Sequence, residues 1–422
     1  MNKKPLLVLQ APIATRSGYG DHARDILRSL YKLDKFDIKL IPTQWGATPQ
    51  NQLDPKTEFG KRAIGDVITK LDKKPDVYVQ LTIANEFRPI GNYNIGITAG
   101  VETTLAPQEF LTASNTMDLL IVPSKFTKDT LEKTVYEKLD KNTHKSVGQL
   151  QLEKPVEVLF EGVNLDTYTG KSTDSSILDN DSIPDFNFLM AGHWLQGDLG
   201  QDRKDIGMTI QTFCTVFKDI PKDKQPGLIL KTSAAGFSIG DREVINDKIK
   251  SITNTFGDKC PPIFLLFGDM SEEELNNLYN HPKVKSMVMF TKGEGYGRPL
   301  AEFATTGKPI IVSKWSGHTD FLPEANTIYL PGELTKVHES TVNKFILKDS
   351  SWFTVNYSVA AQQLYNVYQR YDTYLKHSKG LRSNIIKNFS LDKMTDELGK
   401  IFDKYKVVPE KIELKLPTIH KL

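Results

Sequence analysis

The chain has 422 residues, of which 39% are hydrophobic and 25% charged, and its formal net charge at pH 7 is +2. The length predicts two domains, the composition is that of a globular protein, and the nearly balanced charge argues against a strongly basic nucleic-acid binder, although it leaves room for a local basic groove. The two cysteines, Cys214 and Cys260, make neither a disulfide framework nor a metal-ligand cluster and fit a reducing compartment.

The N-terminal apolar run is short. Residues 6–9 are too few for the hydrophobic segment of a signal peptide, and no small-residue cleavage site follows them. No other stretch approaches the ~20 apolar residues that a membrane-crossing helix needs. We therefore expect a cytoplasmic protein without a transmembrane segment, in which residues 6–9 form the first buried strand.

The first half alternates short apolar runs with helical patterns, which is typical of a parallel sheet covered by helices. The expected strands are residues 6–9, 36–41, 77–81, 94–98, 119–122 and 156–160. A helix is expected over residues 21–30, and another begins after Ser124, whose hydroxyl is a suitable N-cap.

A polar segment rich in serine and aspartate, residues 170–184, is interpreted as the linker, and its Asp179 and Asp181 as solvated charge rather than a metal site. The pattern of apolar runs then restarts. The expected strands are residues 186–191, 227–231, 263–267, 288–290 and 309–312, and the expected helices are 272–279 and 299–306. Residues 357–405 are helical in pattern, and the tail after them is read as an extended packing segment or partly loose.

The most informative segment is residues 291–302, which read Thr-Lys-Gly-Glu-Gly-Tyr-Gly-Arg-Pro-Leu-Ala-Glu. Its three glycines let the backbone turn sharply and approach a ligand, and Pro299 suits the first position of a helix. The amides at that helix start favour an anion such as a diphosphate. Two glutamates eight positions apart, Glu294 and Glu302, flank this turn. The alternative is that Glu294 is a solvated cap and Glu302 pairs with Arg298.

Residues 290–320 resemble the donor-site motif of GT-B glycosyltransferases of the retaining family 4 type. That family has Glu-Gly-Phe-Gly-x-Pro, a second Glu eight positions after the first, and then Gly-x-Pro-hydrophobic. Here the pattern reads Glu294-Gly295-Tyr296-Gly297-Arg298-Pro299, then Glu302, then Gly307-Lys308-Pro309-Ile310. The resemblance implies that Glu294 contacts the donor sugar and its developing charge, that Glu302 holds the ribose hydroxyls, and that the intervening loop binds the donor.

The resemblance also implies the fold and its organisation. We expect an α/β protein of the GT-B type, with two Rossmann-like α/β/α domains facing a cleft and C-terminal helices that cross back to the first domain. Residues 1–170 would form the acceptor-side domain, residues 171–385 the donor-side domain, and residues 386–422 the helix and tail that pack back. The nucleotide would bind where the strands of the second sheet end, next to the cleft.

Three basic side chains are candidates for the diphosphate. Arg203 and Lys204 stand where a helix is expected to begin, a place where cations are unfavourable unless an anion is present. They resemble the Arg/Lys element of the family, although the family's Gly-Arg-Leu is here replaced by Gly-His-Trp at residues 192–194. Lys231 ends a strand and would point into the cleft. The alternative for each is a solvated surface cation.

Further candidates lie in the first domain. Gly18 and Gly20 follow the first strand, and relatives carry a glycine pair near the donor phosphates at this place. Glu102, in Gly-Val-Glu-Thr-Thr after the strand at residues 94–98, resembles a Glu-Thr element for which acceptor recognition is plausible; a plain loop carboxylate is the alternative. His22 lies near the same loops and is an acceptor-side candidate, with a structural role as the alternative.

The expected activity is transfer of a sugar from a nucleotide-diphosphate sugar, UDP- or GDP-linked, to an acceptor hydroxyl with retention of anomeric configuration. Glu294, Arg203 and Lys204 are the expected catalytic residues. No cofactor and no metal are expected, because no histidine or carboxylate cluster has metal-ligand spacing in the loops of the expected site.

Three rival functions remain open. Another GT-B enzyme, such as a phosphorylase or an epimerase, fits poorly, since the chain is short for a phosphorylase and lacks a cofactor lysine motif. A non-catalytic nucleotide-sugar binder would bind donor without turnover. The acceptor could be a glycan, a lipid, a small molecule or a hydroxymethylated DNA base. The lysines that permit DNA binding alternate with acids and are better read as a solvated helix face; they are Lys125, Lys128, Lys133, Lys138, Lys141 and Lys145.

Overall fold

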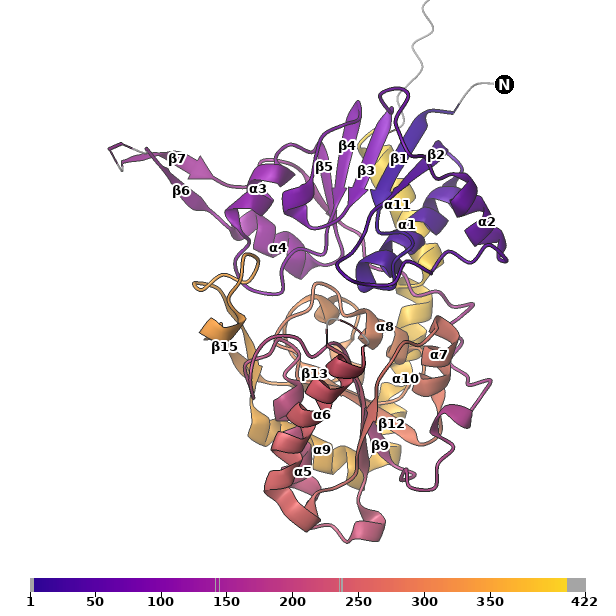
Figure 1. Ribbon diagram of the computed structural model, residues 1–422, viewed down its shortest axis with the longest axis vertical. Helices are drawn as coiled ribbons and strands as arrows, with labels where there is room; N and C mark the ends of the chain where they lie inside the picture. The colour runs from indigo at the N-terminus through magenta and orange to yellow at the C-terminus, as the bar shows by residue number, and fades with distance from the viewer. Residues whose placement is uncertain (1–3, 141, 144, 235, 237, 408–422) are drawn as a thin grey trace, which may run out of the picture.

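The computed structural model describes residues 4–140, 142–143, 145–234, 236 and 238–407. Two α/β domains are stacked along the long axis of the molecule, and each is built on its own six-stranded sheet (Figure 1). Every strand pairing within these two sheets is parallel. The two Rossmann-like halves that the sequence predicted are therefore confirmed.

The first sheet has the strand order β2-β1-β3-β4-β5-β8. Its strands are β1 Leu6–Ala11, β2 Asp37–Pro42, β3 Val77–Leu81, β4 Tyr93–Ile97, β5 Leu119–Val122 and β8 Val156–Val158. Strands β3 and β5 are buried along their whole length, because apolar cores lie on both faces of the sheet. The predicted strands of this half are confirmed, and their ends shift by one or two residues.

The helices of the first domain are α1 Gly18–Leu33, α2 Glu58–Gly65, α3 Gln108–Ser114 and α4 Lys125–Lys133. Helix α1 begins earlier than predicted because the Ser17 hydroxyl accepts a hydrogen bond from Gly20 N at 3.0 Å. The predicted cap of α4 is confirmed, since the Ser124 hydroxyl accepts from Thr127 N at 3.2 Å.

A β-hairpin projects from the first domain beyond α4, at the left of Figure 1, where the sequence predicted a continuing helix face. Helix α4 ends at Lys133, and the chain then forms β6 Tyr136–Leu139 and β7 Ser146–Leu150. Thr134, the C-cap, is already extended, and β-branched and aromatic residues follow it. The prediction of one continuous lysine-bearing helix face is therefore wrong beyond Lys133. Lys138 lies on β6, and Lys141 lies outside the described residues.

The second sheet has the order β11-β10-β9-β12-β13-β14. Its strands are β9 Asn187–Ala191, β10 Gly227–Lys231, β11 Ile263–Leu266, β12 Val284–Met289, β13 Ile310–Ser313 and β14 Ile328–Leu330. Strand β12 starts four residues before the prediction because Lys285 and Ser286 interrupt its apolar run. Strand β14, which is only three residues long, was not predicted.

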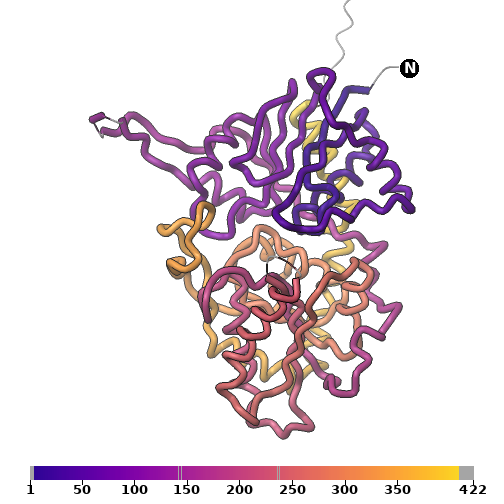
Figure 2. The backbone as a smooth tube through the Cα atoms, in the orientation of Figure 1, coloured from indigo at the N-terminus to yellow at the C-terminus, as the bar shows by residue number. Residues whose placement is uncertain are grey.

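The α-helices that follow the first sheet in the chain are α5 Ile206–Phe217, α6 Ile239–Thr253, α7 Glu272–Asn280, α8 Arg298–Ala304, α9 Tyr357–Gln369, α10 Tyr371–Asn388 and α11 Leu391–Lys404. Helix α11, in yellow, returns to the first domain and lies beside α1 (Figure 2). Its Met394, Leu398 and Phe402 join the first apolar core, so the predicted crossing back is confirmed. The expected tail beyond residue 407 lies outside the described residues.

Short 3-10 helices complete the elements: η1 Ala84–Glu86, η2 Ser176–Leu178, η3 Lys222–Lys224, η4 Asn254–Lys259, η5 Gly317–Asp320, η6 Glu324–Asn326 and η7 Glu339–Thr341. The segment that was expected to be a linker is anchored rather than free. Leu178 of η2 is buried in the core of the second domain, together with Val163 and Tyr168, which precede the expected boundary. Among the described residues no helix combines the length and the apolar character that crossing a membrane requires.

A second hairpin, β15 Gly332–Lys336 and β16 Ser351–Val355, leaves the second domain before α9. We call residues 331–356 the insert. It reaches the first domain, where Thr104 N donates to Ser351 O and Ser351 N donates to the Thr104 hydroxyl, both at 2.9 Å. The rings of Phe345 and Phe110 lie 5.8 Å apart at the same contact. The insert therefore forms a side wall that bridges the two domains (Figure 1).

Candidate active site

Glu294 lies in the glycine-rich loop between β12 and α8, and it is only 6% exposed. Its Oε1 lies 2.5 Å from Lys204 Nζ and accepts a hydrogen bond from the Thr291 hydroxyl at 2.6 Å, while Oε2 lies 3.3 Å from Arg203 Nη1. Burial raises the pKa of Glu294, but the two cations outweigh burial and lower that pKa to about 2. Glu294 is therefore ionised throughout the physiological pH range.

The backbone of Glu294 is held by the loop that follows β13. Glu294 N donates to the Ser316 hydroxyl at 2.9 Å, and Gly317 N donates to Glu294 O at 3.0 Å. Ser316 has a φ of 79°, in the left-handed region that is strained for a residue with a side chain. Ser316 is thus a positioning residue that the sequence analysis missed, because nothing in its immediate sequence marks a strained backbone.

Arg203 and Lys204 precede α5, and Lys292 N donates to Arg203 O at 2.7 Å, which ties their loop to the glycine-rich loop. The sequence suggested that this cationic pair needs a bound anion. In the structure both side chains face the carboxylate of Glu294, so an anion of the chain itself already neutralises the pair. The side chain of Arg203 also donates to Gly293 O at 2.8 Å.

The glycines of this loop allow contact between the domains. A Cβ at Gly293 would overlap the carbonyl oxygen of Glu102, and a Cβ at Gly295 would lie 2.7 Å from the carbonyl oxygen of Ala99. The Ser124 hydroxyl donates to Gly295 O at 2.6 Å. These two glycines were expected to let the backbone approach a diphosphate; in this structure they let it approach the first domain. Gly297, with a φ of 101°, makes the turn into α8.

Glu102 lies in the loop after β4 and faces the second domain. Its Oε1 is 3.7 Å from Arg203 Nη2, so Arg203 stands between two carboxylates, one from each domain. Glu102 is therefore within reach of the cation that neutralises Glu294, and the two loops meet across the interface between the domains.

Glu302 lies on α8 and is 5% exposed. Its Oε1 accepts from Arg298 Nε at 2.9 Å, which is the pairing that the sequence offered as the alternative to ligand binding, and the Tyr279 hydroxyl donates to its Oε2 at 3.4 Å. Burial raises the pKa of Glu302 to about 8, because Arg298 only partly offsets it. Glu302 is therefore held neutral near neutral pH in this closed arrangement.

Arg298 links the two domains through buried carboxylates. Its Nη1 lies 2.7 Å from Asp25 Oδ2 on α1 and 3.7 Å from Glu161 Oε2, which follows β8. One cation thus faces three carboxyl groups, counting Glu302, and burial raises the pKa of Glu161 to about 7. Arg298, Asp25 and Glu161 were not predicted as site residues; for Glu161, an acid directly after an expected strand was an available signal.

A second bridge between the domains lies at the ends of β10 and β11. Lys231 Nζ donates to Gly268 O at 2.6 Å, and among the described residues no carboxylate lies within ion-pair distance of Lys231. Arg16, in the loop after β1, pairs with Asp269 at 2.7 Å and donates to Met270 O at 3.3 Å. Arg16 was also missed, because its partners are more than 250 positions away in the chain.

Other expected residues have more local roles. A Cβ at Gly20 would overlap the carbonyl oxygen of Thr15, so this glycine is explained by helix packing, whereas Gly18 has open space. The ring of Tyr296 is buried in the second core, which leaves only its backbone to contact a donor. His22 is buried beside Glu161 at 3.8 Å, and burial lowers its pKa to about 4, so it is neutral.

Metal-binding side chains are not grouped in the described part of the chain. No three histidine, cysteine, aspartate or glutamate residues lie together there as an ion would require. The site instead gathers paired carboxylates and guanidinium or ammonium groups at the meeting of the two domains, an arrangement that can hold polyhydroxylated and phosphorylated ligands.

Several solved structures have a similar architecture. The chain resembles a sucrose-phosphate synthase of Thermosynechococcus elongatus, with 12% identity over 96% of this chain and 100% of that one and a TM-score of 0.60. A glycosyltransferase of Rickettsia africae gives 15% identity, 96% and 99% coverage and a TM-score of 0.58. The HepE protein of Anabaena, solved in complex with UDP-glucose, gives 12% identity, 95% and 100% coverage and a TM-score of 0.58.

These similarities concern the fold. No protein-family model matches the chain, and no curated protein matches it in sequence. With two parallel-sheet domains and the C-terminal helix returning to the first, the chain has the GT-B fold that the sequence predicted.

Proposed function

We propose that the protein is a retaining glycosyltransferase that moves a sugar from a UDP- or GDP-sugar to an acceptor hydroxyl. The observation that carries this proposal is the buried Glu294, ionised between Lys204 and Arg203, in the loop that meets the first domain of a GT-B fold. Solved proteins of this fold include one that carries UDP-glucose, which supports the donor class.

Each charged group has a role in this proposal. The bond between the anomeric carbon and the phosphate oxygen breaks. Lys204 and Arg203, which contact Glu294 in this structure, then also contact the leaving diphosphate and stabilise its negative charge. Lys231 is available to the same diphosphate because, within the described part of the chain, its ammonium group contacts a backbone carbonyl and no carboxylate. Glu294 then stabilises the positive charge that develops on the sugar ring.

Retention follows in the proposal from attack on the face that the diphosphate leaves. The acceptor oxygen bonds to the anomeric carbon, and the proton of the acceptor hydroxyl passes to the departing phosphate oxygen. This requires no protein nucleophile, and it requires no metal in our scheme, because Lys204 and Arg203 supply the positive charge. The assignment of Glu302 to the ribose hydroxyls rests on the motif resemblance and on its place beside Tyr279.

Donor binding requires the domains to separate, since Glu294 and Glu302 are both covered. The contacts that break are those between Arg203 and Glu102, between Arg298 and Asp25, and between the Ser124 hydroxyl and Gly295 O. Closure over the donor then excludes water, which limits hydrolysis of the activated sugar.

Release of nucleotide diphosphate tests the proposal. Wild-type protein and Glu294→Gln are each incubated with one of four donors: UDP-glucose, UDP-galactose, UDP-N-acetylglucosamine or GDP-mannose. Each donor is tested without an acceptor and with glycan, lipid, small-molecule and hydroxymethylated-DNA acceptors. EDTA is present throughout. We expect release with one donor and one acceptor class, reduced about a hundredfold or more in Glu294→Gln. Donor binding without release for any acceptor would instead identify a non-catalytic binder.

A further inference from the structure

Two cysteines lie side by side in the second domain, although 46 positions of chain separate them. Cys214 is on α5 and is fully buried, whereas Cys260 directly follows η4 and is partly exposed. Both thiols are free, and their sulfur atoms lie 3.8 Å apart in hydrogen-bonding contact. Each sulfur therefore faces the other, and the proposed function gives neither of them a role.

This contact is a short step from a disulfide. Cys260 Sγ donates its hydrogen to Pro261 O at 3.4 Å, so the hydrogen of Cys214 is the one that lies between the two sulfurs. The bonded distance in a disulfide is about 2.05 Å, so the sulfurs need to approach each other by less than ~2 Å. Cys260 lies in the irregular segment between η4 and β11, where the backbone can follow such a movement.

The two thiols differ in their access to solvent. Cys214 has no exposed surface, so a small oxidant reaches Cys260 first and leaves Cys214 behind it as the resolving thiol. Burial raises the pKa of both thiols, so few of them are ionised at neutral pH and their reaction with an oxidant is slow. The pair therefore stays reduced in a reducing compartment and reacts only with sustained oxidant.

A bond between these cysteines closes a loop of chain that contains β10 and α6. Helix α6 is weakly anchored, because its buried residues are Ile245 and Ile252 while Ile239 is 71% exposed. It packs against α5 and η4, and the bond would join α5 to the residue that directly follows η4. The bond would therefore hold the two supports of α6 together, and it would also lower the entropy of the unfolded chain.

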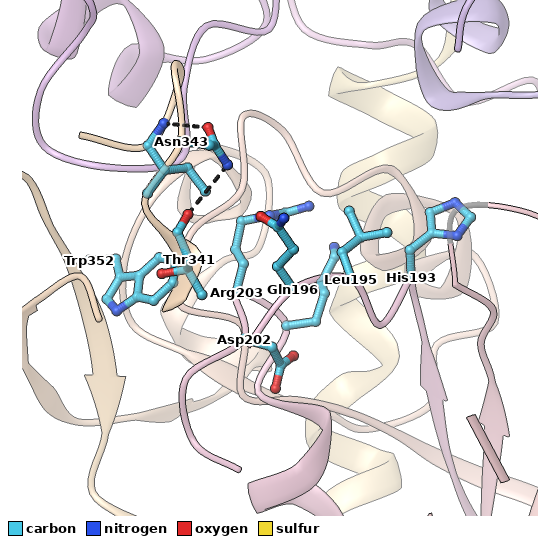
Figure 3. A pocket seen from close by; sticks show the side chains of 10 residues that line it. His193, Leu195, Gln196, Asp202, Arg203, Thr341, Asn343 and Trp352 are labelled. Atoms are coloured by element: carbon cyan, nitrogen blue, oxygen red, sulfur yellow. Dashed lines mark hydrogen bonds between the residues drawn. The ribbon is translucent and has the colours of Figure 1, made fainter. Parts of the chain in front are cut away.

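The cysteine pair is separate from the proposed donor site. Arg203 and Lys204 line a cavity of about 90 Å³ between the loop before α5 and the insert, and this cavity is part of that site (Figure 3). The lining residues that the structure describes include neither cysteine. Cys214 lies eight residues beyond Ile206, the first residue of α5, which is ~12 Å along a helix. A bond at Cys214 therefore leaves the two cations in place.

We propose that Cys214 and Cys260 form a modification site for peroxides, at which oxidation joins α5 to the segment before β11 by a disulfide. The Cys260 thiolate attacks one oxygen of hydrogen peroxide, the O–O bond breaks, and Cys260 becomes a sulfenic acid. The departing hydroxide takes up the proton that the Cys260 thiol lost.

The second step forms the bond. The Cys214 sulfur attacks the Cys260 sulfur, the S–O bond breaks, and the Cys214 proton leaves with the departing hydroxide as water. Two thiols are oxidised and one peroxide is reduced, which gives one disulfide and two waters.

Peptide mapping without reduction tests the proposal. Wild-type protein, Cys214→Ala and Cys260→Ser are treated with excess hydrogen peroxide, which catalase removes before the proteins are unfolded, alkylated and digested. We expect the wild type to give the two cysteine peptides linked, two hydrogens lighter than their sum and separable by dithiothreitol. Cys214→Ala should retain a sulfenic acid on Cys260 that dimedone traps, and Cys260→Ser should leave Cys214 unmodified.

Two further measurements follow the effect of the bond on the fold. The linked wild type should melt about 5–10 °C above the reduced wild type, and dithiothreitol should reverse the difference. Amide hydrogen exchange should slow in α6 and stay unchanged in α11, which lies against the first domain and serves as the internal control.

Three results would overturn the modification site: peroxide-treated wild type with both thiols free, a sulfinic acid on Cys260 in place of the linked peptides, or a link between two copies of the chain. An unchanged Tm together with unchanged exchange in α6 would overturn the role of the bond in holding that helix. None of these measurements needs a nucleotide, so their outcome is independent of the proposed function.

Discussion

The ion pair between Glu294 and Lys204 is covered from solvent, with side-chain exposures of 7% and 9%. Removing one partner leaves the other charge buried without its nearest counter-ion. We expect Glu294→Gln and Lys204→Met each to lower the free energy of unfolding by about 2–4 kcal/mol, and the double variant to lower it by clearly less than the sum. Urea denaturation measures all four proteins. Strict additivity would contradict a direct ion pair.

The raised pKa of Glu161 predicts that the stability of the folded protein depends on pH. Burial raises its pKa to about 7 in the folded protein, near Arg298, Asp25, Asp21 and His22, from about 4.5 when unfolded. The folded state therefore holds the proton more tightly, and the stability from this group, complete below pH 4.5, is lost as pH rises through 7.

The measurement compares wild type with Glu161→Gln by thermal denaturation from pH 5 to pH 8. The glutamine variant keeps the neutral form, so it should be equal to wild type at pH 5 and more stable at pH 8, by about 1–3 kcal/mol. Parallel pH profiles for the two proteins would show that Glu161 is ionised in the folded state and would sink the explanation.

Some residues of the candidate site could be predicted from the sequence, and others could not. Glu294 and Glu302 were singled out because glycine and proline spacing marks the turn and helix start beside them, and Arg203 and Lys204 because they stand where a helix is expected to begin. Their partners could not be found in the same way. Ser316 depends on a strained φ, and Asp25 meets Arg298 across 273 positions of chain, so no local pattern relates them.

Because the glycine-rich loop packs closely against the first domain, a larger side chain in this loop should hinder domain closure. Gly293 has no left-handed φ, so Gly293→Ala acts through its Cβ, which would overlap the carbonyl oxygen of Glu102. We expect a loss of about 1–3 kcal/mol in stability and a larger radius of gyration by X-ray scattering. Gly65→Ala, with nothing within 4 Å of the new Cβ, is the control and should cost nothing. Equal effects would remove the interdomain explanation.

Most elements with a buried face were predicted, whereas the exposed hairpin strands were not. Strands such as β9 are buried along their whole length because both faces of the sheet are covered. Strands β6, β7 and β15 carry mostly exposed residues, so no alternation of buried and solvated positions reports them. Strand β16 of the insert is an exception, because it buries Trp352, Phe353 and Val355, and its aromatic and β-branched residues were an available signal that was missed.

Closure of the two domains depends on Arg298, which faces Asp25 and Glu161 of the first domain and Glu302 of its own. In Arg298→Met these three carboxyl groups lose the guanidinium that they share across the interface, and Asp25 stays buried without its partner from the second domain. We expect the domains to open, so the radius of gyration should increase, and Tm should fall by several degrees. Arg242→Met, an exposed arginine on α6, is the control. A variant as compact as wild type would show that other contacts suffice to keep the domains closed.

The two-domain architecture followed from length and from the restart of the strand pattern, and the GT-B fold followed from the motif resemblance. The closed arrangement of the two domains could not be predicted in this way. It depends on contacts such as that between Arg16 and Asp269, which join loops of different domains. The covered state of Glu294 and Glu302 is a property of the whole molecule, and it makes opening a requirement for donor binding.

A nucleotide-sugar site at Glu294 and Glu302 is tested most directly by a thermal-shift titration with UDP, GDP, ADP and their sugars. Wild type is compared with Glu302→Ala and with Glu273→Ala, an exposed acid on α7 that serves as control. A ligand that binds only the folded state must raise Tm, by an amount that grows with its concentration. We predict a shift with one nucleotide diphosphate, kept in Glu273→Ala and lost in Glu302→Ala. No shift with any nucleotide in folded protein, or a shift that survives in Glu302→Ala, would contradict a nucleotide-sugar site at these two glutamates.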